Sequence, residues 1–540
     1  MTQQEELQVL RALVEKQKEQ LAEKERMIEK QKIQIDNMIQ ALLHARKKIF
    51  GASTETTKQV EGQMSLFESM EELAKQLGVE QKKVVVKPYT RVARKPGVRA
   101  EMLMGLPQEV EEFIIPEEET CSVCGGELKV IGRRIVRTEV EYCPAKLLVK
   151  QIVQQVAKCM VCGEEGSLHP NSHFQQAAVP TPPLPHSLST PSLIAQVMYQ
   201  KFALGLPLAR QEKDWYRLGL VLPRKDMAHW IIRCSQEWFA PVYLRIQEIL
   251  KTCKVLHMDE TRIQCNKEAG KAASSDSFMW VMRSGACEEI QGAFFYYSST
   301  RSGAIARSLL ENFHGYLVTD AYAGYEKAEE VKRALCWAHC RRYFIESIPL
   351  DNKGKEIPGS KGAKGREYIN LLFKIEEEIK ELSLEERKQK RADASRPILD
   401  AFWSWVEETS ALSTTNELLT KALCYATNQR KYLETFLEDG RVPISNNLCE
   451  ANIKPFATAR RAWLFADTPK GATANAILYT LIESAKANDL DIYAYLKYLL
   501  SEMPNNHHLE HPEVIDRYLP WSPELPEECR LKRKKKTCLK

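Results

Sequence analysis

The pattern of apolar and polar positions divides the 540-residue chain into segments of different kinds. Over residues 1–50, apolar residues recur every seven positions, which is the period of a coiled coil. They are Leu7, Val14, Leu21, Ile28, Ile35, Leu42 and Ile49. The companion position three residues later is apolar only near the ends, so we predict an oligomerising coiled coil with a weakened middle. The alternative is one amphipathic helix packed on its own chain.

A second pattern, over residues 251–348, predicts alternating strands and helices. Strand-like apolar runs occur in KVLHMDETRIQC, SFMWVMRS and IQGAFFYYS, and an amphipathic helix follows over 304–313. Next come a strand (GYLVTD), a short helix around 322–330, a strand (RALCW) and a helix from Ala338. This order, β-β-β-α-β-α-β-α, is that of the ribonuclease H-like α/β fold. We expect residues 251–348 and 441–500 to form such a catalytic core.

Two of the strand-like runs each end in a single carboxylate, Asp259 and Asp320, and Glu450 begins a later segment that is predicted to be a helix. Magnesium takes hard carboxylate oxygens and leaves sites for water and phosphate. Two such ions, about 3.5–4 Å apart, can activate the attacking oxygen and stabilise the leaving one in phosphoryl transfer. We therefore expect Asp259, Asp320 and Glu450 to be catalytic and to hold two Mg²⁺ ions, with Mn²⁺ as a substitute. Pro455 is expected to end or bend the Glu450 helix.

Other side chains close to these carboxylates in sequence are suited to active-site support or DNA contact. They are Cys336, His339, Arg341, Arg342, Lys454, Arg460 and Arg461. An arginine guanidinium can grip two phosphate oxygens at once. For His339, a hydrogen bond near the metals or a phosphate and a buried structural role are both consistent with the sequence.

Residues 116–170 contain two Cys-x-x-Cys pairs, Cys121 with Cys124 and Cys159 with Cys162. Each pair turns both sulfurs toward one point, and four thiolates form a closed tetrahedral Zn²⁺ site. Because all four ligands are protein groups, this zinc is expected to be structural. Alternating apolar residues between the pairs predict the strands of a zinc ribbon. A redox-active pair is the alternative.

Residues 186–250 predict consecutive helices, and the second and third have the pattern of a helix-turn-helix. The second ends at Gly219, and the third begins after Pro223 with Arg224 and Lys225. In that motif the second helix of the pair enters the major groove, so Arg224 and Lys225 are candidate DNA contacts. The alternative is a purely structural three-helix unit.

The remaining segments are less strongly patterned. Residues 51–115 predict a basic linker, either an arm along a phosphate backbone or a solvated tether. Residues 349–440 predict a helical insertion rich in Glu and Lys, in which Trp403 and Trp405 are expected in the core rather than as base-stacking platforms. Residues 501–540 predict a loosely ordered tail with a basic end.

Composition adds constraints on location and partners. The net charge of +5 is small, but basic residues gather in Lys82–Arg99 and in the final RLKRKKKTCLK. No apolar run approaches the ~20 residues that span a bilayer, and the polar N-terminus does not resemble a secretory signal. Fifteen scattered cysteines do not form a disulfide framework. We therefore expect a cytoplasmic protein without a membrane partner.

These motifs together resemble the transposases of the insertion sequence 66 family, over nearly the whole chain. The matching strings are CSVCGGEL with CMVCG, LPLARQEKDW, LHMDET, VTDAYAGY, CWAHCRRYF, SNNLCEANIKP and ARRAWLF. That family has an N-terminal leucine zipper, a four-cysteine zinc finger, a helix-turn-helix and a DDE catalytic domain with a helical insertion. The resemblance implies that Asp259, Asp320 and Glu450 are the catalytic triad. Cys336 and His339 match the C(2)H signature that follows the second aspartate in many DDE transposases.

The resemblance also implies the activity and the partners. An oligomer would bind the terminal inverted repeats of its own element, nick at the element's ends, and join the freed 3′-OH to target DNA by direct transesterification. Accessory proteins of the same element often accompany the family. We thus expect a multidomain α+β protein with coiled coil, zinc ribbon, helix-turn-helix and a ribonuclease H-like core. The alternatives are a non-catalytic DNA-binding regulator derived from a transposase and a Mg²⁺-dependent nuclease without strand transfer.

Overall fold

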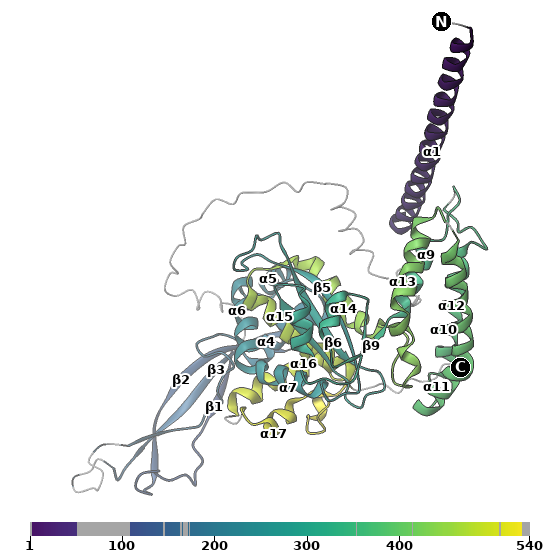
Figure 1. Cartoon of the computed structure of the whole chain (residues 1–540). Helices are drawn as coiled ribbons and strands as arrows, with labels where there is room; N and C mark the ends of the chain where they lie inside the picture. Colours follow the sequence, from purple (N-terminus) through teal and green to yellow (C-terminus); the bar gives the residue numbers. More distant parts are fainter. Residues whose placement is uncertain are drawn as a thin grey trace, which may run out of the picture. The chain divides into compact units, whose positions relative to one another are not determined.

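The computed structural model describes residues 3–50, 108–143, 146–162, 165, 171, 173–352, 354–412, 414–506 and 509–531 (Figure 1). The predicted linker up to residue 107, with its Lys82–Arg99 cluster, and residues 532–540 of the predicted basic tail lie outside the described residues. Contacts divide the chain into two compact units. The helical unit comprises Met1–Lys82, Val318–Ala321 and Lys332–Asn447, and the sheet unit comprises Lys83–Leu317, Tyr322–Val331 and Leu448–Lys540.

The helical unit contains one strand and six helices among its described residues. They are α1 (Gln3–Phe50), β9 (Lys332–Leu335), α9 (Trp337–Glu346), α10 (Lys361–Ile379), α11 (Leu384–Lys390), α12 (Arg396–Ala411) and α13 (Glu417–Leu433). Aromatic rings fill its core, with Trp337 5.6 Å from Phe402 and 5.9 Å from Trp403 between ring centroids. The prediction that Trp403 and Trp405 are core residues is confirmed, because they are 2% and 6% exposed.

A buried arginine joins the helices of this unit. Arg391 is 1% exposed and makes a two-pronged ion pair with Glu376, at 2.8 Å (Nε) and 2.6 Å (Nη2). Its Nη1 also donates to the carbonyl oxygens of Phe436 and Asp439, at 2.6 and 2.9 Å. A buried charge is tolerated when it is paired and its donor nitrogens are hydrogen-bonded in this way.

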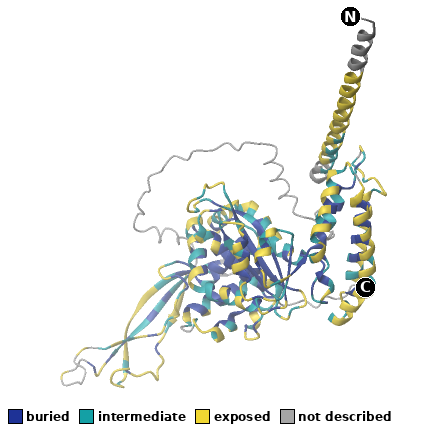
Figure 2. Cartoon of the chain, in the orientation of Figure 1, coloured by how far each residue is buried: buried dark blue, intermediate teal, exposed yellow. Residues whose placement is uncertain are grey.

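Helix α1 is exposed along most of its described side chains (Figure 2). The predicted seam residues Leu21, Ile28, Ile35 and Leu42 are 62%, 52%, 52% and 69% exposed. They therefore do not pack on the described part of their own chain. Oligomerisation through this seam stays a prediction.

Polar side chains attach the C-terminal part of α1 to the rest of the helical unit. The Gln40 amide both donates to and accepts from the Leu350 backbone, at 3.1 and 2.8 Å. Asn37 donates to the Thr415 carbonyl oxygen at 3.1 Å, and His44 Nε2 lies 2.9 Å from the Ile348 carbonyl oxygen. The contacts use a helix face other than the exposed apolar seam, because Asn37, Gln40 and His44 are not in the heptad positions of Ile35 and Leu42.

The sheet unit begins with a four-stranded sheet. Its strands are β1 (Gln108–Phe113), β2 (Leu128–Cys143), β3 (Lys146–Cys159) and β4 (Phe174–Gln176). Strands β2 and β3 form a long antiparallel pair, β1 runs parallel to β3, and β4 pairs with β3. The predicted strands between the two cysteine pairs are thus present, and the register places Leu128 opposite Cys159.

Helices then lead into the second sheet. They are α4 (Pro191–Met198), α5 (Leu208–Arg217), α6 (Arg224–Cys234) and α7 (Ala240–Leu250). The first three were predicted, and α6 begins directly after Pro223, as predicted. Thr190 caps α4 by accepting from the Leu193 N–H at 3.2 Å, and Glu212 of α5 accepts from the Arg224 N–H at 2.9 Å. The Glu212 contact fixes the start of α6 against α5.

The second sheet holds the largest core of the described chain. Its elements are β5 (Val255–Cys265), β6 (Asp276–Ser284), β7 (Ala293–Ser298), α8 (Gly303–Leu309), β8 (Tyr316–Thr319) and β10 (Phe465–Ala466). The strands lie in the order β7-β6-β5-β8, with β10 parallel to β5. Strand β8 continues into the helical unit, where β9 is its neighbour. The predicted element order is confirmed, except that the short helix around 322–330 is a 3₁₀ turn over Ala323–Lys327.

Helices α14 (Asn447–Trp463), α15 (Pro469–Ala487), α16 (Ile492–Glu502) and α17 (Pro512–Ile515) complete the sheet unit. Hydroxyl groups of α15 accept hydrogen bonds from backbone N–H groups on the outer edge of β7. The Ala293 N–H donates to Ser484 Oγ at 3.0 Å, and the Phe295 N–H donates to Thr480 Oγ1 at 2.8 Å. An edge strand with its donors satisfied has less tendency to pair with another chain.

Three sequence-based expectations need correction. Pro455 was expected to end or bend the Glu450 helix, and it does not end it, because α14 continues to Trp463; a bend there stays a prediction. Asp259 is not at the end of its strand, since β5 continues to Cys265. The tail predicted after Pro504 is packed over residues 509–531. Its buried side chains include Ile515, Tyr518, Leu519, Leu525 and Cys529.

Candidate active site and zinc centre

Four cysteine sulfurs lie together at the end of the β2–β3 hairpin where β2 begins and β3 ends. Cys121 and Cys124 precede β2, Cys159 ends β3, and Cys162 follows it. The turn after the first pair requires glycine: Gly125 has φ of +70° and donates its N–H to the Cys121 carbonyl oxygen at 2.8 Å. The hairpin therefore brings together two pairs that are far apart in sequence.

The sulfur distances fit a zinc ion. The Sγ atoms of Cys121 and Cys162 are 3.8 Å apart, and Cys124 Sγ is 3.3 Å from those of Cys159 and Cys162. All four lie within 4.8 Å of one another. Tetrahedral zinc with bonds of about 2.3 Å places its sulfurs about 3.8 Å apart. These residues would hold a structural zinc with no open coordination position.

Backbone groups already favour a thiolate in this cluster. The N–H of Cys162, followed by that of Val161, points at Cys159 Sγ and lowers the pKa of the Cys159 thiol to about 6, against the opposing effect of its burial. The Cys162 N–H lies 3.4 Å from that sulfur. Zinc binds the deprotonated thiol, so a thiolate at Cys159 is consistent with a metal ligand.

In the sheet unit, two of the three predicted acids, Asp259 and Glu450, lie near the thiol of Cys449. Asp259 is half-buried in β5, and its cross-strand partner is Val281 of β6. Cys449, in the first turn of α14, donates to the Val281 carbonyl oxygen at 3.6 Å. Burial first, and then the charges of Asp259 and Glu450, raise the pKa of the Cys449 thiol. The start of α14 therefore lies over the strand pair that carries Asp259.

Glu450 is itself half-buried, with its Oε1 atom out of contact with solvent. Asp259 Oδ1 accepts the Glu260 backbone N–H at 2.8 Å, which fixes the orientation of that carboxylate. Both carboxylates are half-buried, and carboxylate oxygens are the hard ligands that Mg²⁺ prefers.

The third predicted acid, Asp320, belongs to the helical unit, directly after β8. Burial, and then the Arg342 charge, lower the pKa of His339 to about 4, while the Asp320 charge acts in the opposite direction. His339 is therefore neutral near pH 7 and lies within electrostatic reach of Asp320. Cys336 precedes α9, and its buried Sγ accepts the Asn446 N–H at 3.1 Å.

The basic candidates differ in position. Arg341 Nε donates to Asn370 Oδ1 at 2.6 Å, which ties it to α10. On α14, Lys454 and Arg461 follow Glu450 by four and eleven residues, so the three share one stripe of the helix. Lys454 and Arg461 are exposed, whereas Arg460 is half-buried on another face.

On the predicted helix-turn-helix, Arg224 and Lys225 are exposed at the N-terminal end of α6. His229 is exposed one turn further along the same helix. This arrangement leaves the first turns of α6 open to a ligand, as a DNA-reading helix requires.

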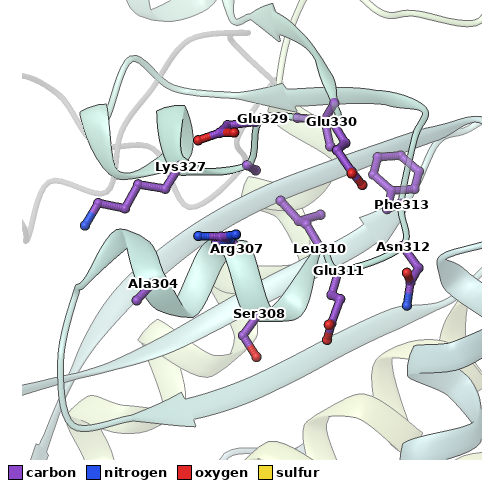
Figure 3. A pocket seen from close by; sticks show the side chains of 12 residues that line it. Ala304, Arg307, Ser308, Leu310, Glu311, Asn312, Phe313, Lys327, Glu329 and Glu330 are labelled. Carbon is purple, nitrogen blue, oxygen red and sulfur yellow. The ribbon is translucent and has the colours of Figure 1, made fainter.

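Two cavities lie in the described part of the sheet unit. One, of about 490 Å³, lies between α8 and the chain before β9, and its lining includes Arg307, Glu311, Lys327 and Glu329 (Figure 3). Another, of about 530 Å³, lies between α5 and α6 beside Tyr216. Neither is lined by Asp259 or Glu450.

Comparison with known families decides the class of protein. The protein-family model described as "Transposase IS66 family" matches residues 186–474, which is more than half of the chain. The chain belongs to the IS66 transposase family. The zinc-finger binding domain of transposase IS66 matches residues 118–163 and includes all four cysteines. The IS66 C-terminal element matches residues 480–521, and a model described as "Transposase C of IS166 homeodomain" matches residues 40–110.

Similar chains extend over most of this transposase. The uncharacterized protein y4hP of Sinorhizobium fredii is 27% identical over 76% of this chain and 75% of its own length. The uncharacterized protein y4jD of the same organism is 26% identical over 77% of this chain and 81% of its own length. A solved structure, the Drosophila P element transposase strand transfer complex, is 15% identical over 58% of this chain and 82% of that chain, with a TM-score of 0.22. A TM-score this low does not establish a shared fold.

Family membership makes this protein a transposase, a DNA-modifying enzyme of an insertion sequence, with a zinc finger. Among the residues that the structure describes, no helix has the length and apolar character to cross a membrane. Sequence reasoning missed Glu260, Arg301 and Tyr325, whose side chains meet on the face of β5 opposite to the Asp259 side chain. The strings LHMDET and VTDAYAGY contain two of them, but their mutual contact depends on the tertiary structure.

Proposed function

We propose that this IS66-family transposase cuts the ends of its element and joins them to target DNA with Asp259, Asp320 and Glu450 as its catalytic acids. Water would attack the phosphodiester at the element end, and the freed 3′-OH would then attack target DNA. The catalytic fold is proposed to be ribonuclease H-like. The observation that supports this most is the packing of the Glu450 helix over the strand pair of Asp259.

The donor set fits divalent magnesium. Asp259 and Glu450 offer hard oxygens in one unit, and Asp320 follows β8, the strand next to β5. When bound, two Mg²⁺ ions would activate the attacking oxygen and stabilise the leaving oxygen. His339, neutral and half-buried near Asp320, is suited to accept or donate a hydrogen bond there rather than to add charge.

Other parts of the chain would bind and orient DNA. Lys454 and Arg461, on the Glu450 stripe of α14, would hold the strand next to the cleaved bond by its phosphates. Arg224 and Lys225 would contact the terminal inverted repeat from α6. The zinc finger would keep the first sheet folded, and the exposed α1 seam would pair with a second copy. Location in the cytoplasm and help from accessory proteins are part of the same proposal.

The decisive experiment replaces Asp259 with Asn in the full-length protein. We expect Asp259→Asn to keep binding to element ends but to lose strand cleavage by at least about a thousandfold, since a catalytic metal ligand is removed. Asp276→Asn is the matched control, because Asp276 lies on the adjacent strand β6 and pairs with Arg262 at 3.6 Å. Cleavage by Asp259→Asn at the wild-type rate would remove Asp259 from the mechanism.

A strand-transfer assay with a pre-cut end tests the joining step separately. The proposed transposase joins such an end to target DNA. A protein that cuts element ends but does not join the pre-cut end is a nuclease, and that result would contradict the joining step alone.

A further inference from the structure

A buried glutamate next to Asp259 has both of its oxygens engaged. The Glu260 side chain is 2% exposed. Its Oε1 accepts from Arg301 Nε at 2.6 Å, and its Oε2 accepts from the Tyr325 hydroxyl at 2.5 Å. Arg301 precedes α8, and Tyr325 lies in the 3₁₀ turn after β8. One carboxylate thus joins three segments that are far apart in sequence.

Aromatic contacts close the network. The Arg301 guanidinium lies 4.1 Å from the centre of the Tyr322 ring, and the Tyr322 hydroxyl donates to the Arg301 carbonyl oxygen. Trp280 is the cross-strand partner of Glu260, and its ring meets that of Tyr325 edge-on at 6.0 Å. Cation–π and edge-to-face contacts of this kind hold rings in one orientation.

The backbones also approach closely at this point. A Cβ atom added to Gly303 would lie 2.5 Å from the Gly324 carbonyl oxygen and 2.9 Å from Gly324 Cα. Only glycine permits this separation between the start of α8 and the 3₁₀ turn. The turn is therefore fixed by side chains on one side and by backbone contact on the other.

The position of this network bears on the proposed catalytic acids. Asp259 and Glu260 are consecutive in β5, so their side chains point to opposite faces of the sheet. Tyr322 is the second residue after Asp320. The network thus fastens the chain that leaves Asp320 to the strand that carries Asp259.

We propose that Glu260, Arg301 and Tyr325 are positioning residues for the transposase reaction, which hold the segment after Asp320 in register with β5. The inference rests on the proposed function, in which Asp259 and Asp320 act together. Arg301 and Tyr325 donate to the two Glu260 oxygens, so the role assigned to Glu260 is to hold these segments together rather than to bind metal. A shift of 1 Å in a catalytic group is enough to lower the rate by about a hundredfold.

The test uses two variants of the full-length protein, Glu260→Gln and Tyr325→Phe. Each removes one part of the network and keeps the size of the side chain. We expect each to lower the kcat of end cleavage roughly ten- to hundredfold with little change in the Kd for end DNA. A second readout is independent of activity: Mn²⁺ binding to the DNA-free protein, followed by electron paramagnetic resonance, should weaken several-fold.

Two control variants separate positioning from general stability. Tyr243→Phe removes another buried hydroxyl, which donates to the Phe295 carbonyl oxygen at 2.9 Å. Glu376→Gln weakens the buried pair with Arg391 in the helical unit. Both should lower the unfolding temperature and leave Mn²⁺ binding unchanged.

The outcomes are distinct. Wild-type kcat and Mn²⁺ binding in Tyr325→Phe, with Asp259→Asn inactive, would overturn the positioning role and leave the proposed function standing. Several-fold weaker Mn²⁺ binding in both network variants, with unchanged binding in both controls, supports the role. Full cleavage by Asp259→Asn would overturn the proposed function, and the inference with it. If Glu260→Gln does not fold, Tyr325→Phe decides the result alone.

Discussion

The zinc centre and the proposed catalytic site are assembled in opposite ways. The zinc ligands form two close pairs, and the single hairpin of β2 and β3 is enough to bring the pairs together. Asp259 and Glu450 come from β5 and from α14, with strands β6 to β9 and helices α8 to α13 between them in sequence. Local sequence therefore defines the first site, whereas the second depends on helix-to-sheet packing.

The two sites also differ in how much hydrophobic core surrounds and stabilises them. The four cysteines have little surrounding core: the cluster around Ile115, Ala157 and Ala177 is small. A module of that kind depends on its metal for much of its stability. The Asp259 strand is instead embedded in the largest core of the described residues, which extends through β5, β6, β7 and α15. The two sites should thus respond differently to mutation.

Loss of one zinc ligand is expected to have the largest effect. Cys159→Ser should reduce the zinc content from about one ion per chain to nearly none, because structural zinc binding by such sites contributes on the order of 10 kcal/mol. Proteolysis should then cut within residues 108–176, while the second sheet stays resistant. Zinc content and the cleavage map measure both effects. Cys287→Ser, an exposed cysteine outside the cluster, is the control and should retain zinc.

Removal of a packing residue tests the other side of the comparison. Phe456 of α14 is fully buried, with its ring 5.1 Å from that of Tyr479 and 6.4 Å from that of Phe295. Phe456→Ala should lower the free energy of unfolding by about 3–5 kcal/mol. Because Phe456 anchors the helix that carries Glu450, cleavage should fall as well, with zinc content unchanged.

The matched control is Leu464→Ala. Leu464 follows α14 and is 64% exposed, so its replacement should change stability by less than about 0.5 kcal/mol. Denaturant titration measures the difference. Equal stability of the Phe456 and Leu464 variants would show that α14 is not anchored by its aromatic face.

Many helices and strands of this fold could be predicted from the sequence, because residues within or next to each element indicate where it lies. The start of α6 was predicted from Pro223, and the end of α5 was predicted from Gly219, which lies two residues beyond it. Strands β5, β6 and β7 were predicted from their runs of apolar residues. The Cys-x-x-Cys spacing identified the zinc ligands. Each of these signals lies within a few residues of the feature that it predicts.

The remaining features depend on contacts that spacing does not encode. Pro455 was expected to end or bend its helix, yet α14 continues past it, because Phe456 and Ala459 beyond it are buried against the sheet unit. The chain after Pro504 is polar in sequence, but the side chains of Tyr518 and Leu519 are buried in the core. Glu260 looked like one acid among many, and only its contacts with Arg301 and Tyr325 distinguish it.

Lys201 is a buried cation that links the helices before α5 to the Glu450 helix. It is 9% exposed, and its Nζ lies 4.4 Å from the Phe202 ring centre and 4.7 Å from that of Trp463 at the end of α14. It donates to Asn475 Oδ1 of α15 at 3.3 Å. Burial lowers the pKa of Lys201 to about 7, while the two rings favour its charged form.

The smallest expected effect concerns this lysine and its dependence on pH. The unfolded chain holds the Lys201 proton up to about pH 10.4, whereas the folded protein releases it near pH 7. The destabilising effect is therefore full below pH 7 and fades as the pH rises toward 10. We expect Lys201→Met to raise the midpoint of thermal unfolding by roughly 3–6 °C at pH 6 and by less than about 2 °C at pH 10. Lys470→Met, at an exposed position in the first turn of α15, should shift the midpoint equally at both pH values. A gain for Lys201→Met that is independent of pH would mean that the lysine is charged in the folded protein throughout this range, with the rings of Phe202 and Trp463 outweighing its burial.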